Sequence, residues 1–260
     1  MTAEKIAPEG ILKLKFKTDA GLGSRANIGM IVLSSDQTLE LEFRTLLDFE
    51  GVALYHARIP NEMEITEGTL AQMEAELPIT ASLLPASFNF DVIGYGCTSG
   101  TTVIGEGRVA KAIRTAHPGI LVTNPLTACK AALSALGLKR IAFLTPYKPA
   151  ITRAMRDNLM EEGFEIPVTA SFYESDDFVV GRITSDSILE SVKNIGVRDD
   201  CDGVFVSCTN LRAASVIAPA EEYLEKPVTS SNHALAWHML RLAGISDSPV
   251  NLGRLFQQKL

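Results

Sequence analysis

Two cysteines, Cys97 and Cys208, lie in two similar stretches of the chain, GYGCTSG at 94–100 and VSCTNLR at 206–212. In each stretch an apolar run ends in Cys-Thr and then turns polar. Two thiols that approach one carbon from opposite sides suit proton chemistry, because one thiolate removes a proton while the other thiol donates one from behind. Alternatively, one thiolate adds to an activated C=C bond and the second thiol protonates the intermediate. Neither route needs a metal or an organic cofactor, so we expect none.

Polar residues follow each cysteine and are candidates for binding a substrate. Thr98 and Ser99 follow the first cysteine, and Thr209 and Asn210 follow the second. Both stretches lead into a predicted helix, whose free N–H groups bind carboxylates and lower the pKa of a thiol. Ser35, at the end of another strand, could also bind a carboxylate, although such hydroxyls often only complete turns. A lone cysteine at a strand end is usually a small core residue, so the functional interpretation depends on the repeated pattern.

Short apolar runs alternate with helical segments along the chain. Strands are predicted at 28–35, 52–59, 90–97, 119–123, 140–147, 166–173, 201–208 and just after 226. Helices are predicted at 36–47, 69–84, 105–116, 125–138, 149–163, 185–196, 212–224 and up to 244. This alternation predicts parallel sheets covered by helices on both faces. Ligands bind at the carboxyl ends of the strands in such sheets, and both cysteines lie at such an end.

The order of the elements repeats within the chain. Met30 in the first strand lies about as far before Cys97 as Phe143, in a later strand, lies before Cys208. We interpret this as an internal duplication that gives an α/β fold of two pseudo-symmetric parallel-sheet domains. Each domain is a three-layer, flavodoxin-like unit, and the active site lies between them. The last strand and helix have no counterpart in the first half, and we expect them to cross back and complete the first domain. The predicted domains are 1–120 plus 228–260, and 121–227.

The composition is that of an ordinary globular chain, with 46% hydrophobic and 21% charged residues among 260. Its net charge of −7 argues against a nucleic-acid or anionic-membrane surface, which would need a basic patch. The stretch MTAEKIAPEGILKLKFKTDAGLG has no apolar run long enough for a signal peptide or a membrane helix, so we expect a cytoplasmic protein. The four cysteines form no C-x-x-C pair and no zinc-binding spacing, which predicts free thiols and no metal site.

Five segments carry a resemblance to a known family: in chain order, VLSSDQTLE, GYGCTSG, IAFLTPYKP, DDFVVGR and VSCTNLR. They resemble the aspartate/glutamate racemase superfamily, in its branch of maleate cis-trans isomerases, arylmalonate decarboxylases and related ectoine-utilisation proteins. The resemblance covers roughly residues 28–245. It implies two α/β domains with the site between them and a two-cysteine mechanism without a cofactor. By position in these motifs, it implies that Cys97 is the nucleophile, that Cys208 is the proton donor and that Tyr147 contacts the substrate.

Two acidic residues depart from the pattern of the isomerases in that branch, which have Asn where Asp36 and Asp177 align here. An amide can donate a hydrogen bond to a substrate carboxylate, whereas an ionised Asp only accepts one and repels a dicarboxylate. Two such changes in one pocket would suit a substrate with an ammonium, amide or amidine group. The alternative is that Asp36 caps the helix that begins at Thr38 and that Asp177 is a solvated loop residue.

The leading hypothesis is an isomerase or racemase of a small carboxylic acid, with an amino-acid-like acid of ectoine utilisation as a candidate substrate. The predicted catalytic residues are Cys97 and Cys208. The predicted substrate-binding residues are Ser35, Asp36, Thr98, Ser99, Tyr147, Asp177, Thr209 and Asn210. We expect a homodimer or another homo-oligomer.

Two other functions stay open. One is a decarboxylase of an activated diacid, which the retained Cys97 argues against, because the resemblance implies that the decarboxylases lack this cysteine. The other is a small-molecule binding protein that has lost catalysis, since two α/β domains around a cleft also describe solute-binding proteins.

Overall fold

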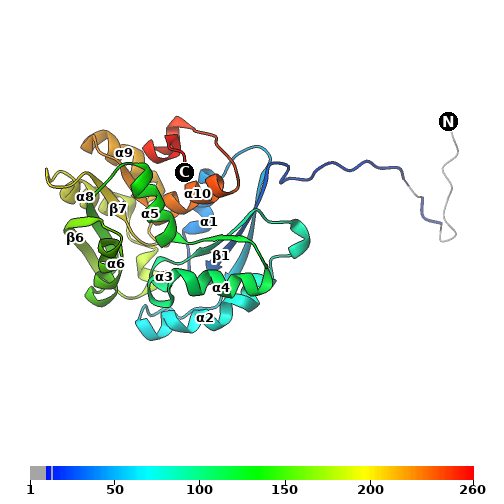
Figure 1. Cartoon of the computed structure of the whole chain (residues 1–260), viewed down its shortest axis with the longest axis horizontal. Coiled ribbons are helices and arrows are strands. Elements are labelled where there is room, and N and C mark those ends of the chain that lie inside the picture. The colour runs from blue at the N-terminus through cyan, green and yellow to red at the C-terminus, as the bar shows by residue number, and fades with distance from the viewer. Residues whose placement is uncertain (1–9, 13) are drawn as a thin grey trace.

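Two parallel four-stranded sheets form the frame of the molecule in the computed structural model, which describes residues 10–12 and 14–260 (Figure 1). The first sheet has the order β2-β1-β3-β4 and consists of β1 (Ala26–Leu33), β2 (Val52–Ile59), β3 (Val92–Gly96) and β4 (Leu121–Thr123). The second has the order β6-β5-β7-β8 and consists of β5 (Arg140–Tyr147), β6 (Glu165–Glu174), β7 (Gly203–Val206) and β8 (Val228–Ser230). The equal strand order confirms the predicted class, an α/β fold of two similar parallel sheets.

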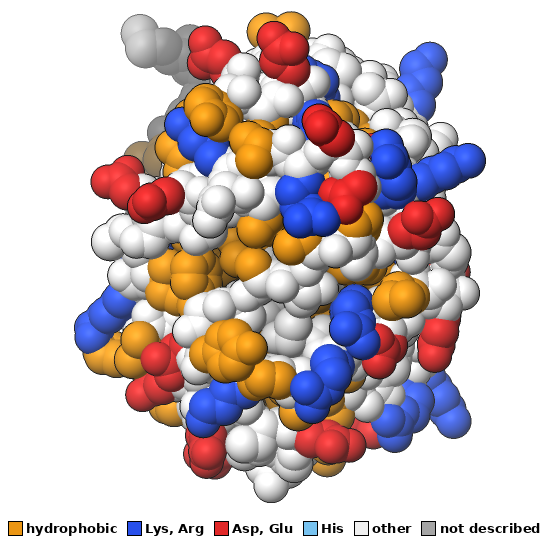
Figure 2. All heavy atoms as spheres, turned by 90° about the vertical axis from the view of Figure 1, so that its left-hand side faces the viewer, with side chains coloured by type: hydrophobic (Ala, Val, Ile, Leu, Met, Phe, Trp, Pro, Cys, Tyr) orange, Lys and Arg blue, Asp and Glu red, His pale blue; other side chains and the backbone are white. Residues whose placement is uncertain are grey.

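Helices connect these strands. They are α1 (Leu39–Leu46), α2 (Glu67–Ser82), α3 (Thr98–Ile104), α4 (Glu106–Ala116), α5 (Pro125–Ala135), α6 (Pro149–Glu161), α7 (Asp177–Val180), α8 (Ser185–Gly196), α9 (Ala214–Leu224) and α10 (Ser231–Leu242). Short 3-10 helices lie at η1 (Ala86–Phe88), η2 (Val250–Leu252) and η3 (Arg254–Gln257). On the face that Figure 2 shows, acidic and basic side chains are intermingled with apolar ones.

Strand β1 shows how the first sheet is buried on both faces. Ile31 and Leu33 belong to one apolar cluster, which also contains residues of α2 and of the second half of the chain. Met30 and Val32 point to the other face, into a cluster with residues of α1, α5 and α10. Because alternate residues of a strand point to opposite faces, a continuous apolar run places apolar side chains against helices on both sides. The three-layer arrangement follows from this strand sequence.

The last strand and the helix after it pack against different halves of the molecule. Strand β8 pairs with β7, with Val228 opposite Val204, so our expectation that this strand completes the first sheet is wrong. The chain returns from β7 through α9 to the neighbouring position of the same sheet, as a βαβ unit does. Helix α10 then packs against α1, α5 and β3 of the first half. Strand β4 pairs with β3, so residues 121–123 belong to the first sheet. The extent of each domain stays a prediction.

Helix α3 is an element that the sequence pattern did not predict. It begins directly after Cys97, whereas we expected the next helix to start at residue 105. Its sequence, TSGTTVI, contains β-branched residues and Gly100, which are poor helix formers. Most of its residues are buried, so tertiary packing stabilises it. Gly105, with a φ of 93°, then separates α3 from α4.

Candidate active site

One cavity contains both cysteines and lies where strands of the two sheets end. Cys97 follows β3 of the first sheet, and Cys208 comes two residues after β7 of the second. The other lining residues are Leu33, Asn61, Glu62, Glu64, Ile65, Thr69, Leu70, Met73, Ser99, Tyr147, Asp177 and Thr209. The cavity offers about 20 Å³ of free space, room for roughly one water molecule. A substrate therefore has to widen it.

Cys97 is the N-cap of helix α3. Its Sγ accepts a hydrogen bond from the Gly100 N–H at 3.1 Å and lies 3.6 Å from the Ser99 Oγ. Burial raises the pKa of the Cys97 thiol to about 11, although the contacts with Ser99 and Gly100 act in the opposite direction. Our expectation that the start of a helix would lower this pKa is wrong, because the loss of hydration outweighs the two hydrogen bonds.

Cys208 has an unusual backbone conformation. Its φ is 134°, a value that residues with a side chain rarely adopt. Its N–H donates to the Ser231 Oγ at 3.0 Å, and its Sγ accepts from the Asn210 N–H at 3.3 Å. Burial raises the pKa of the Cys208 thiol well above its ordinary value, and the charge of Asp177 adds to this shift. Both thiols are thus neutral in the resting cavity.

Tyr147 ends strand β5 and faces both cysteines. Burial raises the pKa of its hydroxyl well above the ordinary value, and negative charge on Cys208 or Cys97 raises it further. Its backbone oxygen accepts hydrogen bonds from the Thr152 Oγ1 at 3.0 Å and from the Ser171 Oγ. The phenol therefore stays protonated and can donate to a substrate oxygen or to a thiolate.

Asp177 lines the cavity, whereas Ser35 is not a lining residue and contacts two that are, Asp177 and Asn61. The Ser35 Oγ donates to the Asp177 Oδ2, and the Asn61 Nδ2 donates to the Ser35 Oγ at 2.8 Å. Asp177 is 5% exposed, so the alternative that it is a solvated loop residue is wrong. Burial raises its pKa, while hydrogen bonds with Ser35 and Asn210 oppose the shift.

Asp36 lies outside the residues that line the cavity. Its Oδ1 accepts from the Thr38 N–H at 2.8 Å and from the Leu39 N–H at 2.7 Å, as a residue that caps a helix does. Its Oδ2 is buried and has no hydrogen-bond partner among the described residues. Burial raises the pKa of Asp36 to about 6.

The remaining predicted binding residues divide into two groups. Ser99 and Thr209 line the cavity. Thr98 and Asn210 are not among the lining residues: the Thr98 Oγ1 lies 2.8 Å from the Ser231 Oγ, and the Asn210 Nδ2 donates to the Asp177 backbone oxygen at 2.8 Å. Thr209 also ties the two halves together, because its Oγ1 donates to the Gly96 oxygen at 3.2 Å.

The segment after β2 supplies residues that sequence reasoning missed. Asn61, Glu62 and Glu64 all line the cavity. This segment also binds the second half, since the Ile65 N–H donates to the Ser175 oxygen at 2.8 Å and the Asp177 N–H donates to the Met63 oxygen at 2.9 Å. The rule that ligands bind at the carboxyl ends of parallel strands, applied to β2 as it was to β3, would have included them.

The electrostatic character of the cavity is acidic. Asp177, Glu62 and Glu64 line it, and none of its described lining residues is Lys, Arg or His. Asp177 is buried, so a bound dianion would meet its carboxylate with little screening and with no cation among the described lining residues, whereas solvent screens the exposed Glu62 and Glu64. The lining favours a ligand that brings a positive charge of its own.

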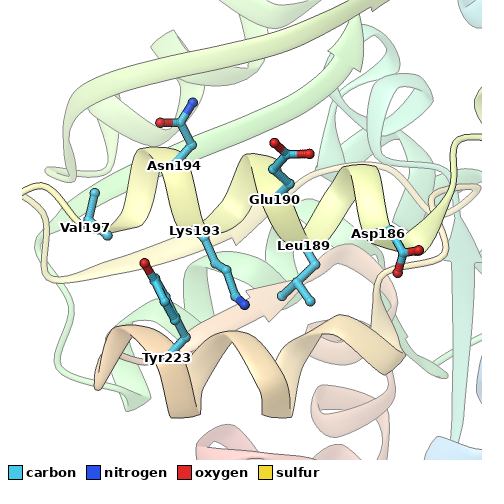
Figure 3. Close-up of a pocket in the computed structure, with 7 residues that line it drawn as sticks. All are labelled: Asp186, Leu189, Glu190, Lys193, Asn194, Val197 and Tyr223. Carbon is cyan, nitrogen blue, oxygen red and sulfur yellow. The ribbon is translucent and has the colours of Figure 1, made fainter.

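A second hollow, of about 600 Å³, lies between helices α8 and α9 (Figure 3). Lys193 from α8 and Tyr223 from α9 lie side by side in it, with the Lys193 Nζ 4.4 Å from the ring centre. Its other lining residues are Asp186, Leu189, Glu190, Asn194 and Val197. It contains neither cysteine, so we assign no chemistry to it.

Among residues 10–12 and 14–260, no group of His, Cys, Asp and Glu could hold a metal ion, and no helix has the length and apolarity needed to cross a membrane.

The chain is similar to known enzymes over most of its length. A family model described as arylmalonate decarboxylase matches residues 108–256. A maleate isomerase of Alcaligenes faecalis is 26% identical over 242 residues, which are 88% of this chain and 95% of that enzyme. An arylmalonate decarboxylase of Bordetella bronchiseptica is 29% identical over 142 residues, 54% of this chain and 59% of that protein. A solved structure of a Nocardia farcinica maleate cis-trans isomerase matches this chain with a TM-score of 0.81 and 25% identity. The match covers 89% of this chain and 98% of that one. In that structure a cysteine is mutated to serine, and a covalently bound succinylcysteine intermediate is present.

Proposed function

Because the chain belongs to the arylmalonate decarboxylase family, whose model matches residues 108–256, we propose that it is a cofactor-independent isomerase of a small carboxylic acid. The observation that carries the proposal is that Cys97 and Cys208, from different sheets, line one cavity. The similarity to the Alcaligenes maleate isomerase extends over 88% of the chain, which supports an isomerase.

The mechanism that we propose uses covalent addition to a double bond. The neutral Cys97 thiol first gives its proton to a carboxylate in the cavity, either that of Asp177 or that of the bound acid, and regains it at the end of the cycle. The resulting thiolate forms a C–S bond to one alkene carbon of the acid, and the π electron pair moves to the other carbon, next to a carboxyl group. Cys208 gives its proton to that carbon, and the new single bond rotates. Cys208 then takes a proton back, the C–S bond breaks, and the trans alkene and both starting thiol states are restored. The succinylcysteine intermediate of the Nocardia isomerase supports this route.

The protonated Tyr147 hydroxyl stabilises charge during these steps. Negative charge develops first on the substrate carbon and its carboxyl group, and then on the Cys208 sulfur once Cys208 has given up its proton. Tyr147 lines the same cavity, and a neutral phenol held there donates without needing to reorganise. Ser99, whose Oγ lies 3.6 Å from the Cys97 Sγ, is placed to orient the nucleophile.

The substrate that we propose carries a cationic nitrogen beside its carboxyl group. Asp177, Glu62 and Glu64 line the cavity without a described Lys, Arg or His among the lining residues. This charge pattern disfavours a dicarboxylate such as maleate and favours an amino-acid-like acid, of the kind that ectoine utilisation would supply. On such an acid, the same two thiols would exchange the α-proton from opposite sides and invert the centre.

Decarboxylation of an activated diacid is the second candidate, because the family model and the Bordetella relative both carry that description. It would release carbon dioxide, which isomerisation does not.

We further propose a cytoplasmic homodimer. The support for the dimer is an apolar stretch before β1, where Ile11, Leu14, Phe16 and Leu22 are each more than half exposed and the chain extends away from the body (Figure 1). Removing residues 1–22 should shift the mass in solution from a dimer to a monomer.

Cys97→Ser and Cys208→Ser test the proposed function. Maleate and a panel of amino-acid-like acids are followed by NMR in deuterium oxide, which reports trans product, carbon dioxide loss and α-deuterium entry together. We expect each variant to lose about 10²–10⁴-fold in kcat, because each lacks a nucleophile or a proton donor. Cys208→Ser is also incubated with an alkene acid that the wild type converts. Mass spectrometry should then show an adduct of that acid on Cys97.

Cys201→Ser is the matched control, since Cys201 is buried at the start of a strand region and does not line the cavity. It should keep full activity. Full activity in both Cys97→Ser and Cys208→Ser would refute the mechanism.

A further inference from the structure

The first turn of helix α10 contacts the loops of both cysteines. The Ser231 Oγ accepts a hydrogen bond from the Cys208 N–H at 3.0 Å. The same oxygen lies 2.8 Å from the Thr98 Oγ1. Thr98 is the first residue of α3, the helix that Cys97 caps. One hydroxyl group thus joins the backbone of the second cysteine to the residue that follows the first.

Cys208 needs such a contact because its backbone is held in an unfavourable conformation. A φ of 134° on a residue with a side chain persists only where the surroundings determine it. The N–H of Cys208 is fixed by Ser231, and the next residue, Thr209, is fixed by the Asn232 Nδ2, which donates to its oxygen at 2.7 Å. Two successive residues of α10 therefore hold two successive residues of the cysteine loop.

Bulk water does not reach the Ser231 hydroxyl. Ser231 has no exposed surface, and Thr98 and Cys208 are 1% and 3% exposed. Buried polar groups in proteins are almost always paired, and an N–H left without an acceptor is costly. Loss of this oxygen would favour a rearrangement of the Cys208 backbone.

Ser231 lies at a point of the fold where its side chain can fix the distance between the two cysteine loops. Strand β8 belongs to the second sheet, and α10 starts at the next residue, Ser231, and packs on α1, α5 and β3 of the first half (Figure 1). Every residue of α10 from 231 to 240 is buried. The side chain at the start of α10 is thus anchored to both sheets.

We infer that Ser231 is a positioning residue that fixes the Cys208 sulfur relative to the Cys97 sulfur. The catalytic consequence rests on the proposed function, but the geometric claim does not. Without the Ser231 hydroxyl, the two sulfurs reach one small molecule together less often, although each thiol remains present. Chemistry that needs both thiols suffers, whereas reaction of Cys97 alone does not.

The probe for this geometry is 1,3-dichloroacetone, a small reagent with two displaceable chlorides. Each thiolate forms one C–S bond and releases one chloride, so a bridge between two cysteines loses both. Mass spectrometry of peptides separates a Cys97–Cys208 bridge from single adducts. We expect the wild type to form the bridge, and Ser231→Ala to form it at a several-fold lower yield while Cys97 still reacts.

Three further variants separate positioning from general loss of stability. Thr123→Val removes another buried hydroxyl bond to the same helix, the one between the Thr123 Oγ1 and the His238 Nδ1 at 2.7 Å. It should lower the melting temperature about as Ser231→Ala does and leave the bridging yield unchanged. Thr98→Val removes the contact between Thr98 and Ser231 but keeps the hydrogen bond from the Cys208 N–H to Ser231. Its bridging yield should lie between those of the wild type and Ser231→Ala. Ser231→Thr retains the hydroxyl and should restore bridging.

Activity gives a second readout on whichever acid the wild type turns over. Ser231→Ala should lower kcat on the order of 10²-fold with KM little changed, as expected for a small misplacement of a reacting group. Wild-type bridging yield in Ser231→Ala, or an equal loss of bridging in Thr123→Val, would overturn the inference. Full activity of Cys97→Ser with bridging lost in Ser231→Ala would instead refute only the proposed function.

Discussion

Cys97 and Cys208 are buried thiols, and burial governs the chemistry open to them. The pKa of Cys97 is about 11, and that of Cys208 lies well above its ordinary value. A thiol of higher pKa is less often ionised but gives a more basic and more nucleophilic thiolate. Such a sulfur suits removal of a weakly acidic proton, or return of a proton to carbon, better than a solvated cysteine would.

The candidate site was predictable where its residues repeat and unpredictable where they do not. Cys97 and Cys208 stand out because the same Cys-Thr pattern ends two strands. Asp36 illustrates the limit, because a cap and a ligand have the same sequence signature, and only the contacts with Thr38 and Leu39 show that it caps α1. The sequence analysis did not single out Glu62 and Glu64, since nothing local in the sequence shows which loop closes over a cavity.

Asp177→Asn tests the electrostatic basis of substrate choice. Asp177 lines the cavity, and replacing its carboxylate with an amide removes one repelling charge and adds a donor. We expect kcat/KM for maleate to rise at least about tenfold, equivalent to about 1.4 kcal/mol of repulsion. Activity on an amino-acid-like acid should fall. Steady-state kinetics on both acids measures the change.

Asp36→Asn is the control for this prediction, because Asp36 does not line the cavity and instead caps α1. Its amide oxygen can accept the same two hydrogen bonds from Thr38 and Leu39, so the variant should stay folded and show no gain on maleate. An equal gain in both variants would contradict the assignment of Asp177 as the residue that contacts substrate.

The secondary-structure elements were largely predictable from the alternation of apolar runs and amphipathic segments, and the misses have a physical cause. Side chains change direction with one period along a strand and with another along a helix. The local sequence encodes these two periods for the strands and for most of the helices. Helix α3 does not, because TSGTTVI has low helix propensity and folds through its burial beside α2 and the cavity. The sheet that takes β8 is likewise set by contacts distant in sequence.

Gly100→Ala tests the close approach that α3 makes at the nucleophile. A Cβ at this position would lie 2.5 Å from the Tyr95 Oη and 2.9 Å from the Cys97 Sγ. The added methyl must displace the sulfur or the phenol, so we expect at least about tenfold loss of activity and a destabilisation of about 1–3 kcal/mol. Urea unfolding and kinetics on the same preparation give both numbers.

Gly107→Ala is the matched variant, since Gly107 lies in α4 and a Cβ there meets nothing within 4 Å. Alanine should stabilise the helix by up to about 1 kcal/mol and leave activity unchanged. If Gly100→Ala behaved in the same way, the packing of α3 against Cys97 would not be tight enough to position the sulfur.

At the scale of the whole molecule, helix α1 joins the two halves through polar contacts behind the cavity. The Thr38 Oγ1 donates to the Asn210 oxygen at 2.9 Å. Glu42 accepts from the Ala214 N–H and from the Asn232 Nδ2, both at 2.8 Å. In the sequence, Glu42 is one acidic residue of an amphipathic helix and looks solvated. The fold places it against the starts of α9 and α10, which only the packing of the two halves determines.

Glu42 should make the stability of the whole fold fall as the pH rises. Burial raises its pKa from 4.5 to about 7, so the folded protein keeps a proton that the unfolded chain has already lost between these values. Stability is therefore highest below about pH 4.5 with respect to this group and declines up to about pH 7, by at most about 3 kcal/mol. Glu42→Gln cannot ionise, so its unfolding free energy should match that of the wild type at pH 4 and exceed it at pH 8. Glu40→Gln is the opposite control, because Glu40 pairs with Arg58 and has a lowered pKa, which adds stability that is lost as the pH falls. Urea unfolding of the three proteins at both pH values decides the matter, and a Glu42→Gln curve that declines as steeply as the wild type would place the pH dependence elsewhere.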